Sequence, residues 1–383
     1  MTRPRKYTFP VRDGNAFTLL VDGAQYYAAM LAGIQQARAF IFLEQYLVTT
    51  GTIGQQFSQA LSRAVDRGVK VYCLLDDYGS RGLRADSRQA LLDAGIQLAF
   101  YNPIRLRQWQ IALFRDHRKL LLIDNTLGFV GGAGITDDFI GDTPDAGWHD
   151  IVLQIKGPVL LDWCQLFQNT WRQMTGIDIR LPETCTTHPT GHTRGQVLAN
   201  FPWRQEFNRL LLNRMERATT RIWLATPYFV PVWKLRRRLR RMAKQGLDVR
   251  LLLPGDLSDH PWVSQAARRY YTHLLRHGVR IFEYEPRFTH VKLVLCDHWV
   301  SIGSINLDRW NQHWNLDANQ AINEPAFAAA TAEVFLADFA QSREIKLADW
   351  LRRPWWQRWH EGYAGYVVLL LEKLSRYRPQ RRQ

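Results

Sequence analysis

The sequence predicts an α/β protein built from two similar halves that pack about a pseudo-twofold axis and share one active site. Amphipathic stretches alternate with short apolar, strand-like stretches, which favours largely parallel sheets covered by helices on both faces. The segment HRKLLLID, from His117 to Asp124, also recurs as HVKLVLCD, from His290 to Asp297. The pattern His-x-Lys-x-x-x-x-Asp therefore occurs twice, 290 − 117 = 173 residues apart, and indicates an internal duplication.

The duplication extends beyond these two motifs. Three further pairs of segments match in the same order: 37–48 with 219–230, 57–77 with 233–256, and 91–103 with 274–286. The first pair predicts a buried strand. The second pair predicts an amphipathic helix, ended by Gly68 or Gly246, and then a hydrophobic strand. The third pair repeats this order of helix, glycine and strand, so each half contains the same series of elements.

These repeats predict the domain organisation. A stretch rich in Pro, Thr and Gly, RLPETCTTHPTGHTRG, separates the two series of repeats and is typical of a linker. The expected units are an N-terminal tail (1–14), a first half (15–179), the linker (180–195), a second half (196–347) and a C-terminal segment (348–383).

Composition limits the partners. Lys and Arg number 50 against 35 Asp and Glu, so the surface should attract anions such as nucleic acid, anionic lipid or phosphorylated small molecules. The four cysteines lack C-x-x-C spacing, which argues against a disulfide framework or a zinc site and favours thiols in a reducing compartment. The basic start has no apolar signal region, and no stretch reaches the ~18 apolar residues of a membrane span. A soluble or peripheral protein is expected.

The repeated motif predicts a phosphate-directed site. His117 and Lys119 are two residues apart at the start of a predicted strand, so their side chains project from the same face, as do those of His290 and Lys292. Around a pseudo-twofold axis, two imidazoles and two ammonium groups would converge. The lysines could neutralise a phosphodiester while one histidine attacks phosphorus and the other protonates the leaving oxygen. That division requires one neutral and one protonated imidazole, which a histidine pKa near neutrality makes accessible. The chemistry requires no metal and no cofactor.

The paired motifs resemble those of the phospholipase D superfamily, and the surrounding sequence is most similar to its bacterial cardiolipin synthase branch. The similarity extends from about Ala16 to Phe339 and includes FLEQY, RGVKVYCLLDDYGS, ATPYFVP, DVRLLLPGDLSDH and IGSINLDRW. The resemblance implies two phospholipase D-like halves and a metal-free, two-step exchange through a phosphohistidine. It also implies that the site residues are His117, Lys119, His290 and Lys292. The sequence does not indicate which histidine is the nucleophile.

The resemblance assigns further roles. Asp150 and Asp317 match the acidic residue that bonds the far nitrogen of each catalytic histidine, although Asp317 stands where Glu is usual. Asn306, with Ser304 beside it, matches an amide expected to bind phosphate.

In the first half the counterparts of Asn306 and Ser304 are Gly134 and Gly132, which departs from full symmetry. Backbone N–H groups at Gly132 could still bind an oxyanion. Asp124 and Asp297 complete the motif and are counted with the site. Because they lie seven residues beyond the histidines, a structural role in closing a turn is the favoured interpretation.

The predicted function is phosphatidyl transfer from one phospholipid, with phosphatidylglycerol as the expected donor, to a hydroxyl of another. Two alternatives use the same site: hydrolysis to phosphatidic acid, as in a phospholipase D, and cleavage of another phosphodiester such as nucleic acid. Nucleic acid is disfavoured because the motif sequences are most similar to the synthase branch. Intact His and Lys residues in both halves argue against an inactive lipid-binding module.

Two segments suggest an anionic membrane surface as partner. The helix predicted at 233–244 has apolar residues on one face and arginines on the rest, which favours either lipid docking or a solvated face. The basic segment 354–383 predicts either a helix in the membrane interface or one packed on the body. Its regularly spaced large residues are Trp356, Trp359, Tyr363, Tyr366, Leu370 and Leu374. We therefore expect a peripheral protein at the cytoplasmic face of the bacterial inner membrane. The sequence indicates no oligomeric state.

Overall fold

The computed structural model describes residues 8–103, 114–141, 146–180, 187–202, 206–308 and 314–354. The first half contains β1 (Arg12–Val21), α1 (Asp22–Gln36), β2 (Phe40–Gln45), α2 (Thr52–Asp66), β3 (Lys70–Asp76), α3 (Ala85–Asp93), β4 (Gln97–Tyr101), β5 (Arg115–Asp116), β6 (Leu120–Ile123), β7 (Leu127–Gly131), a 3₁₀ turn (Asp137–Phe139), β8 (Ile151–Lys156) and α4 (Leu160–Thr175). The second half contains β9 (Thr193–Asn200), α5 (Glu206–Arg217), β10 (Arg221–Ala225), α6 (Trp233–Lys244), β11 (Asp248–Pro254), α7 (Pro261–Arg268), α8 (Tyr271–Leu275), β12 (Arg280–Tyr284), β13 (Leu293–Cys296), β14 (Trp299–Gly303), β15 (Asn315–Asn323), α10 (Pro325–Ala340), β16 (Ser342–Ile345) and α11 (Leu347–Arg352).

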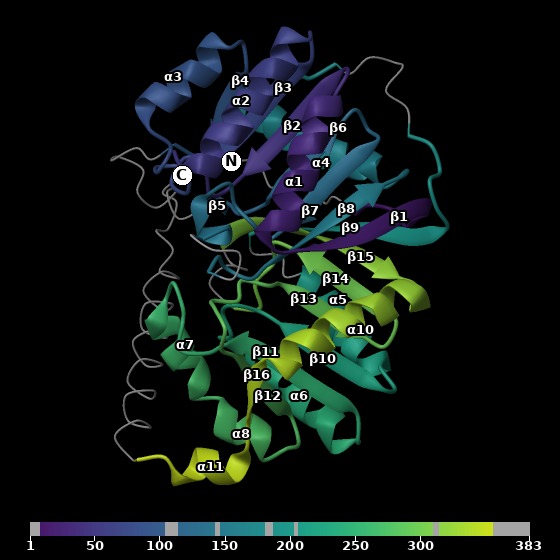
Figure 1. The fold of residues 1–383 in the computed structure, drawn as a ribbon. Helices are drawn as coiled ribbons and strands as arrows, with labels where there is room; N and C mark the ends of the chain where they lie inside the picture. Colours follow the sequence, from purple (N-terminus) through teal and green to yellow (C-terminus); the bar gives the residue numbers. More distant parts are fainter. Residues whose placement is uncertain are drawn as a thin grey trace, which may run out of the picture.

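The strands of the described residues form one continuous sheet that runs through both halves (Figure 1). In the first half the strand order is β4-β3-β2-β6-β7-β8-β1, and in the second it is β12-β11-β10-β13-β14-β15-β9. The two orders match strand for strand, and β16 is added outside β12. The antiparallel pair of β1 and β9 joins the halves. The duplicated α/β fold predicted from the sequence is therefore confirmed.

The sheet is mixed, so the expectation of largely parallel sheets is wrong. The longer parallel pairings lie in the outer strands of each half, such as β2 with β3 and β3 with β4, and the two-residue strand β5 pairs parallel with β15. The strands that follow the motif, β6 and β13, pair antiparallel with their neighbours on both sides. A short turn joins β6 to β7, and a connection of that length permits only antiparallel neighbours.

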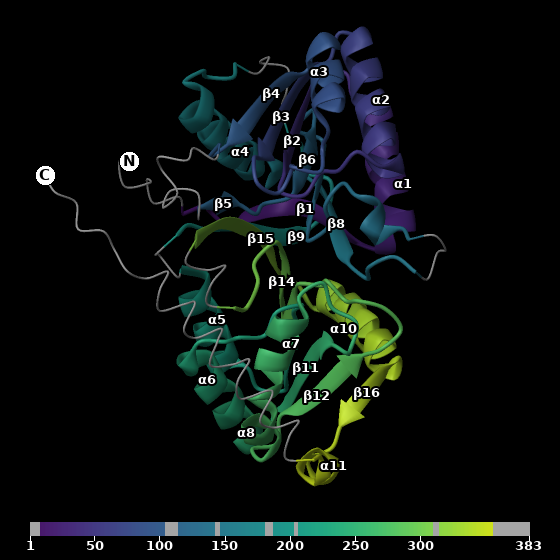
Figure 2. The same cartoon turned by 90° about the vertical axis from the view of Figure 1, so that its left-hand side faces the viewer.

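Helices cover both faces of the sheet in each half. Figure 2 shows α1 and α2 on one face of the upper half and α4 on the other, with α5 and α6 opposite α10 in the lower half. The amphipathic pattern explains the packing: α6 buries Leu235, Leu239 and Met242 in the core. The Trp163 indole of α4 also donates to Gln320 Oε1 of β15 at 2.8 Å, so the two halves share core contacts.

Several elements cross the domain boundaries expected from the sequence. The strands β1 and β9 begin before residues 15 and 196, and α11 crosses residue 348. The Trp350 ring of α11 lies 4.9 Å from that of Tyr271, so α11 packs on the body. Residues 181–186 of the expected linker and the C-terminal helix expected within 354–383 lie outside the described residues, apart from Pro354. No helix in the described part is long and apolar enough to cross a membrane.

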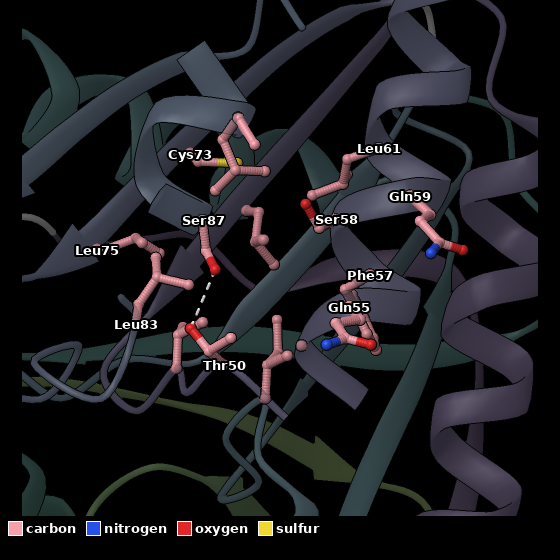
Figure 3. A pocket seen from close by; sticks show the side chains of 16 residues that line it. Thr50, Gln55, Phe57, Ser58, Gln59, Leu61, Cys73, Leu75, Leu83 and Ser87 are labelled. Carbon is pink, nitrogen blue, oxygen red and sulfur yellow. Dashed lines mark hydrogen bonds between the residues drawn. The ribbon is translucent and has the colours of Figure 1, made fainter. Parts of the chain in front are cut away.

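An apolar pocket of about 200 Å³ lies between α2, α3 and β3 of the first half (Figure 3). Its lining includes Phe57, Leu61 and Leu83, with a hydrogen bond of 3.2 Å from Thr50 Oγ1 to Ser87 Oγ at one side. None of the lining residues belongs to the repeated motif. The pocket is therefore separate from the site that the motif predicts.

The final aspartates of the two motifs organise turns. Asp124 and Asp297 adopt the left-handed conformation, with φ of 52° and 50°. The Asp124 carboxylate accepts the N–H groups of residues 38–40 at 2.7–2.8 Å, and Asp297 accepts those of residues 219–221 at 2.7–3.0 Å. Both aspartates lie at the far end of their strands from the motif histidines. Their inclusion among the catalytic candidates is therefore wrong, and their role is to tie the turn to the start of β2 or β10.

We predict that Asp297→Ala lowers the free energy of unfolding at pH 7 by about 1–2 kcal/mol, after allowance for the partial exposure of the carboxylate. Burial alone would raise the pKa of Asp297, but the hydrogen bonds from Thr220, Arg221 and Thr219 lower it to about 2. The contribution of the Asp297 carboxylate to the free energy of unfolding should therefore be complete above about pH 4 and decrease as the pH falls towards 2. Urea unfolding followed by tryptophan fluorescence measures it. A difference between variant and wild type that does not change with pH would contradict this role.

Candidate active site

The two motif segments meet at the junction of the halves. His117 lies between β5 and β6, and its backbone N–H donates to the carbonyl of Leu316 in β15 at 2.8 Å. In the same way, the N–H of His290 donates to the carbonyl of His149 at 2.7 Å. Each motif segment is thus hydrogen-bonded to the half that does not contain it. This places both histidines at the junction of the two halves.

The histidine side chains also bond across the junction. Nδ1 of His117 lies 2.9 Å from Oδ1 of Asp317, and Nδ1 of His290 lies 2.8 Å from Oδ2 of Asp150. All four side chains are buried. A carboxylate acceptor favours the tautomer with its proton on Nδ1, which leaves Nε2 with a lone pair directed away from the carboxylate. Each half therefore supplies one imidazole and the carboxylate that orients the other imidazole.

The two lysines are buried beside the histidines. Nζ of Lys119 donates to the His117 carbonyl at 2.7 Å, and Nζ of Lys292 donates to the His290 carbonyl at 2.8 Å. Burial and the charge of Lys292 lower the pKa of Lys119 to about 7. Burial lowers the pKa of Lys292 to about 8, against the attraction of Asp150. Two buried ammonium groups this close together favour the binding of an anion.

The same crowding keeps the imidazoles neutral. Burial and the charge of Lys119 lower the pKa of His117 to about 4, despite its bond to Asp317. Burial and both lysines lower the pKa of His290 well below its ordinary value. The expectation of histidine pKa values near neutrality is therefore wrong for this structure. A bound phosphodiester would raise both values, because its negative charge stabilises an imidazolium.

Of the residues expected to bind phosphate, Ser304 already has hydrogen-bond partners within the protein. Ser304 Oγ donates to Asp317 Oδ1 at 2.8 Å and accepts the N–H of Ala318 at 3.1 Å. Ser304 therefore stabilises the Asp317 carboxylate that orients His117, and its expected phosphate contact stays a prediction. Asn306 is buried in the segment after β14.

Gly132 lies directly at the site. A Cβ atom there would be 2.5 Å from Oδ2 of Asp150 and 3.0 Å from Nζ of Lys292. The close approach of the Asp150 carboxylate explains why glycine replaces the serine of the other half. The backbone of this position, rather than a side chain, faces the Asp150 and Lys292 groups.

Sequence analysis missed two tyrosines beside the histidines. The Tyr46 ring packs edge-on against His117, with 4.9 Å between ring centroids, and the Tyr228 ring lies 6.5 Å from His290. The Tyr228 hydroxyl donates to the Asp259 carboxylate. The repeat contained the information needed, since matching 37–48 with 219–230 aligns Tyr46 with Tyr228.

The residue between His and Lys differs between the motifs. Arg118 is buried on the opposite face of the strand from the catalytic candidates, where its guanidinium contacts Asp116 at 3.0 Å, Glu44 at 2.8 Å and Thr170 at 2.9 Å. Its counterpart, Val291, packs in the apolar core. The first motif is therefore anchored by a buried ion network and the second by apolar contacts.

The arrangement is suited to attack on an anionic phosphorus. Two neutral imidazoles can provide a nucleophile and, after proton uptake, an acid, while the lysines stabilise charge on the phosphoryl oxygens. Among the described residues, no cluster of three or more His, Cys, Asp or Glu side chains is arranged to hold a metal ion.

Comparisons with known proteins agree with this chemistry. A family model described as "Cardiolipin synthase, PLD-like domain" matches residues 30–171 and 211–339. The chain is 34% identical over 356 residues to cardiolipin synthase A of Pseudomonas putida strain W619, covering 90% of this chain and 73% of that protein. It is 31% identical over 371 residues to cardiolipin synthase of Alkalihalophilus pseudofirmus, covering 94% and 73%.

Two solved structures show the same fold. A phosphatidylserine synthase from Haemophilus influenzae superposes with a TM-score of 0.73 at 13% identity, covering 94% of each chain. A polyphosphate kinase from Porphyromonas gingivalis superposes with a TM-score of 0.60 at 14% identity, covering 87% of this chain and 49% of the kinase.

We predict that 5 mM sulfate raises the melting temperature by roughly 2–4 °C at pH 6 and by less at pH 9, because an anion bound only by the folded state stabilises it. Lysines with pKa values of about 7 and 8 lose their protons between these two pH values, while the charge of sulfate stays constant. Lys292→Met should abolish the shift, and Lys156→Met, at an exposed position on β8, should retain it. Differential scanning fluorimetry measures the effect. An equal shift in both variants would locate sulfate elsewhere.

Proposed function

Because the chain belongs to the cardiolipin synthase family of phospholipase D-like proteins, we propose that it transfers a phosphatidyl group from phosphatidylglycerol to a hydroxyl of a second phospholipid. The crossed pairing of His117 with Asp317 and of His290 with Asp150 is the observation that supports this proposal best. It orients two imidazoles at the junction of the halves, and a two-step exchange at one phosphorus atom requires such a pair.

In the first proposed step, Nε2 of one histidine attacks the phosphorus of the donor lipid. An N–P bond forms, the bond from phosphorus to the glycerol oxygen breaks, and the other histidine, as an imidazolium, gives its proton to that oxygen. Lys119 and Lys292 stabilise the charge on the non-bridging oxygens. The products of this step are glycerol and a phosphatidyl-histidine.

In the second step, the now neutral histidine accepts a proton from the hydroxyl of the acceptor lipid. That oxygen attacks phosphorus, the N–P bond breaks, and the nucleophilic histidine is restored. With phosphatidylglycerol as acceptor, the product is cardiolipin. Water in place of the lipid would give phosphatidic acid. Burial of the His and Lys side chains supports transfer, since an enclosed site limits competition from water.

The proposed partner surface is an anionic membrane. The buried face of α6 packs in the core, so its outward face carries basic side chains such as Lys234 and Arg237 next to the exposed Trp233. The Arg237 guanidinium lies 5.2 Å from the centre of the Trp233 ring, an arrangement suited to a membrane interface. The buried thiols Cys73 and Cys296 form no disulfides, which supports the cytoplasmic surface as the place of action.

We predict that purified protein converts phosphatidylglycerol vesicles to cardiolipin and glycerol in the presence of EDTA, and that His117→Ala and His290→Ala each abolish turnover. Both imidazoles are needed, because one forms the covalent bond and the other transfers protons. Mass spectrometry of the lipid products measures the reaction.

His298→Ala is the matched control, since His298 is exposed in the turn between β13 and β14 and should be dispensable. Wild-type activity in either motif variant would contradict the paired site. Phosphatidic acid as the sole product would establish hydrolysis in place of transfer.

We predict that vesicle binding depends on charge. Replacing both Lys234 and Arg237 with Gln should weaken binding to vesicles that contain phosphatidylglycerol by roughly thirtyfold, since each basic residue near an anionic surface contributes about 1 kcal/mol. Deleting residues 354–383 tests the C-terminal segment in the same way. Vesicle flotation at low and high salt measures both, with neutral phosphatidylcholine vesicles as control. Unchanged flotation for a variant would exclude its segment from the membrane contact.

A further inference from the structure

A third buried histidine, His149, lies next to the site, between carboxylates from opposite halves. Nδ1 of His149 is 2.7 Å from Oδ1 of Asp22, at the start of α1, and Nε2 is 3.1 Å from Oδ1 of Asp338, in α10. The imidazole also stacks on the Tyr284 ring, with centroids 5.0 Å apart and planes 20° from parallel. Only 2% of His149 is exposed. A carboxylate within ion-pair distance of each ring nitrogen favours the cationic imidazole, in which both nitrogens are protonated.

Asp22 connects this cluster to Asp150. It has a φ of 66°, a left-handed conformation that is uncommon for a residue other than glycine. Its backbone N–H donates to the Asp150 carbonyl at 2.9 Å, while its carboxylate pairs with His149 and with Arg287. Arg287 in turn donates to the Gly147 carbonyl at 3.1 Å. Asp22, in its left-handed conformation, is thus held by contacts to Asp150 and to the residues just before it.

The backbone of His149 continues to the catalytic histidine. Its N–H donates to the Phe288 carbonyl at 2.8 Å, and its carbonyl accepts the His290 N–H at 2.7 Å. Anchoring the His149 side chain therefore fixes the two hydrogen-bonded backbone segments that contain Asp150 and His290. The orientation of the Asp150 carboxylate towards Nδ1 of His290 depends on these segments.

Among the described residues, the equivalent position of the other half carries no such cluster. Leu316 occupies the position before Asp317 that His149 occupies before Asp150, and its carbonyl accepts the N–H of His117 at 2.8 Å. The backbone contact is the same in both halves, but the Leu316 side chain packs in the apolar core. The duplication alone therefore does not explain the charged side chain at position 149.

We propose that His149 is a positioning residue, a doubly protonated imidazolium held between one carboxylate of each half, which fixes Asp150 and thereby sets the basicity of His290. It acts through Asp150 and touches neither substrate nor reacting atoms. The inference concerns the proposed phosphatidyl transfer and depends on it for its kinetic test.

Electrostatics supports this role. Burial alone would lower the pKa of His149, but the bonds to Asp22 and Asp338 raise it to about 9. Burial raises the pKa of Asp150 to about 6, and the charges of Lys292, His149 and Lys119 oppose that rise. The other titratable groups around Asp150 are His290 and the hydroxyls of Tyr26 and Tyr27 in α1. Besides the two carboxylates, His149 faces the Tyr284 ring and, through Asp22, the Arg287 guanidinium.

The test is the pH dependence of kcat for His149→Gln, which keeps a polar side chain but removes the charge. When the positive charge of His149 is removed, the pKa of Asp150 should rise. Asp150 should then take up a proton at a higher pH and no longer orient His290. We expect the acidic limb of the profile to move up by about one pH unit, which is a roughly tenfold loss of rate on that limb. At pH 8.5 the variant and wild type should differ much less.

Leu239→Val is the control, because Leu239 lies fully buried in the second-half core, and the substitution destabilises the protein without touching the site. The acidic limb of the pH profile of Leu239→Val should coincide with that of wild type. If His149→Gln lowers only the melting temperature and leaves the limb unmoved, His149 is merely structural and the proposal is wrong.

Histidine-labelled NMR of the full chain gives a readout that needs no turnover. At pH 7.5 the signals lost in His149→Gln should belong to a ring with both nitrogens protonated, and a neutral ring would overturn the proposal. The signals of His290, identified by their loss in His290→Ala, should change at a higher pH in His149→Gln than in wild type. Absence of phosphatidyl transfer in wild type would refute the proposed function, whereas an unshifted His290 transition would refute the role of His149.

Discussion

The crossed hydrogen bonds between the histidine of one half and the aspartate of the other are the constraint on which the rest of the structure depends. His117 is oriented by Asp317 and His290 by Asp150, so neither half contains a complete acid–base unit. The crossing requires the halves to keep a fixed relation to each other within a few tenths of an ångström. A sheet that continues from one half to the other through β1 and β9 provides that rigidity.

Burying two lysines and two histidines together carries an electrostatic cost, and the protein limits it in two ways. The pKa values of both lysines and both histidines are lowered, so part of the charge is absent at neutral pH. Asp150 and Asp317 offset much of what remains. An anionic phosphodiester completes the compensation, and binding it is coupled to proton uptake. The substrate therefore creates the imidazolium that the reaction needs.

Much of this could be predicted from the sequence, because duplicated strands and motifs leave a repeated pattern of apolar and polar residues. The pairing of His117 with Asp317 could not, since it joins residues 200 apart through a register that only the folded sheet defines. Ser304 illustrates the same limit: its chemistry suits phosphate, yet the nearest acceptor in the structure is Asp317. The antiparallel motif strands were missed because apolar runs predict strands but not their direction.

Duplication gives the two histidines the same first neighbours, whereas the surrounding residues make them different. His117 is followed in its motif by Arg118 with its ion network. The residue before Asp317, the carboxylate that orients His117, is the apolar Leu316. His290 is followed in its motif by the apolar Val291. The residue before Asp150, the carboxylate that orients His290, is the charged His149. The cluster beside His117 is thus made of first-half residues alone, whereas the cluster beside His290 is shared between the two halves. The two imidazoles therefore have different surroundings before an asymmetric substrate distinguishes the one that bonds to phosphorus from the one that transfers protons.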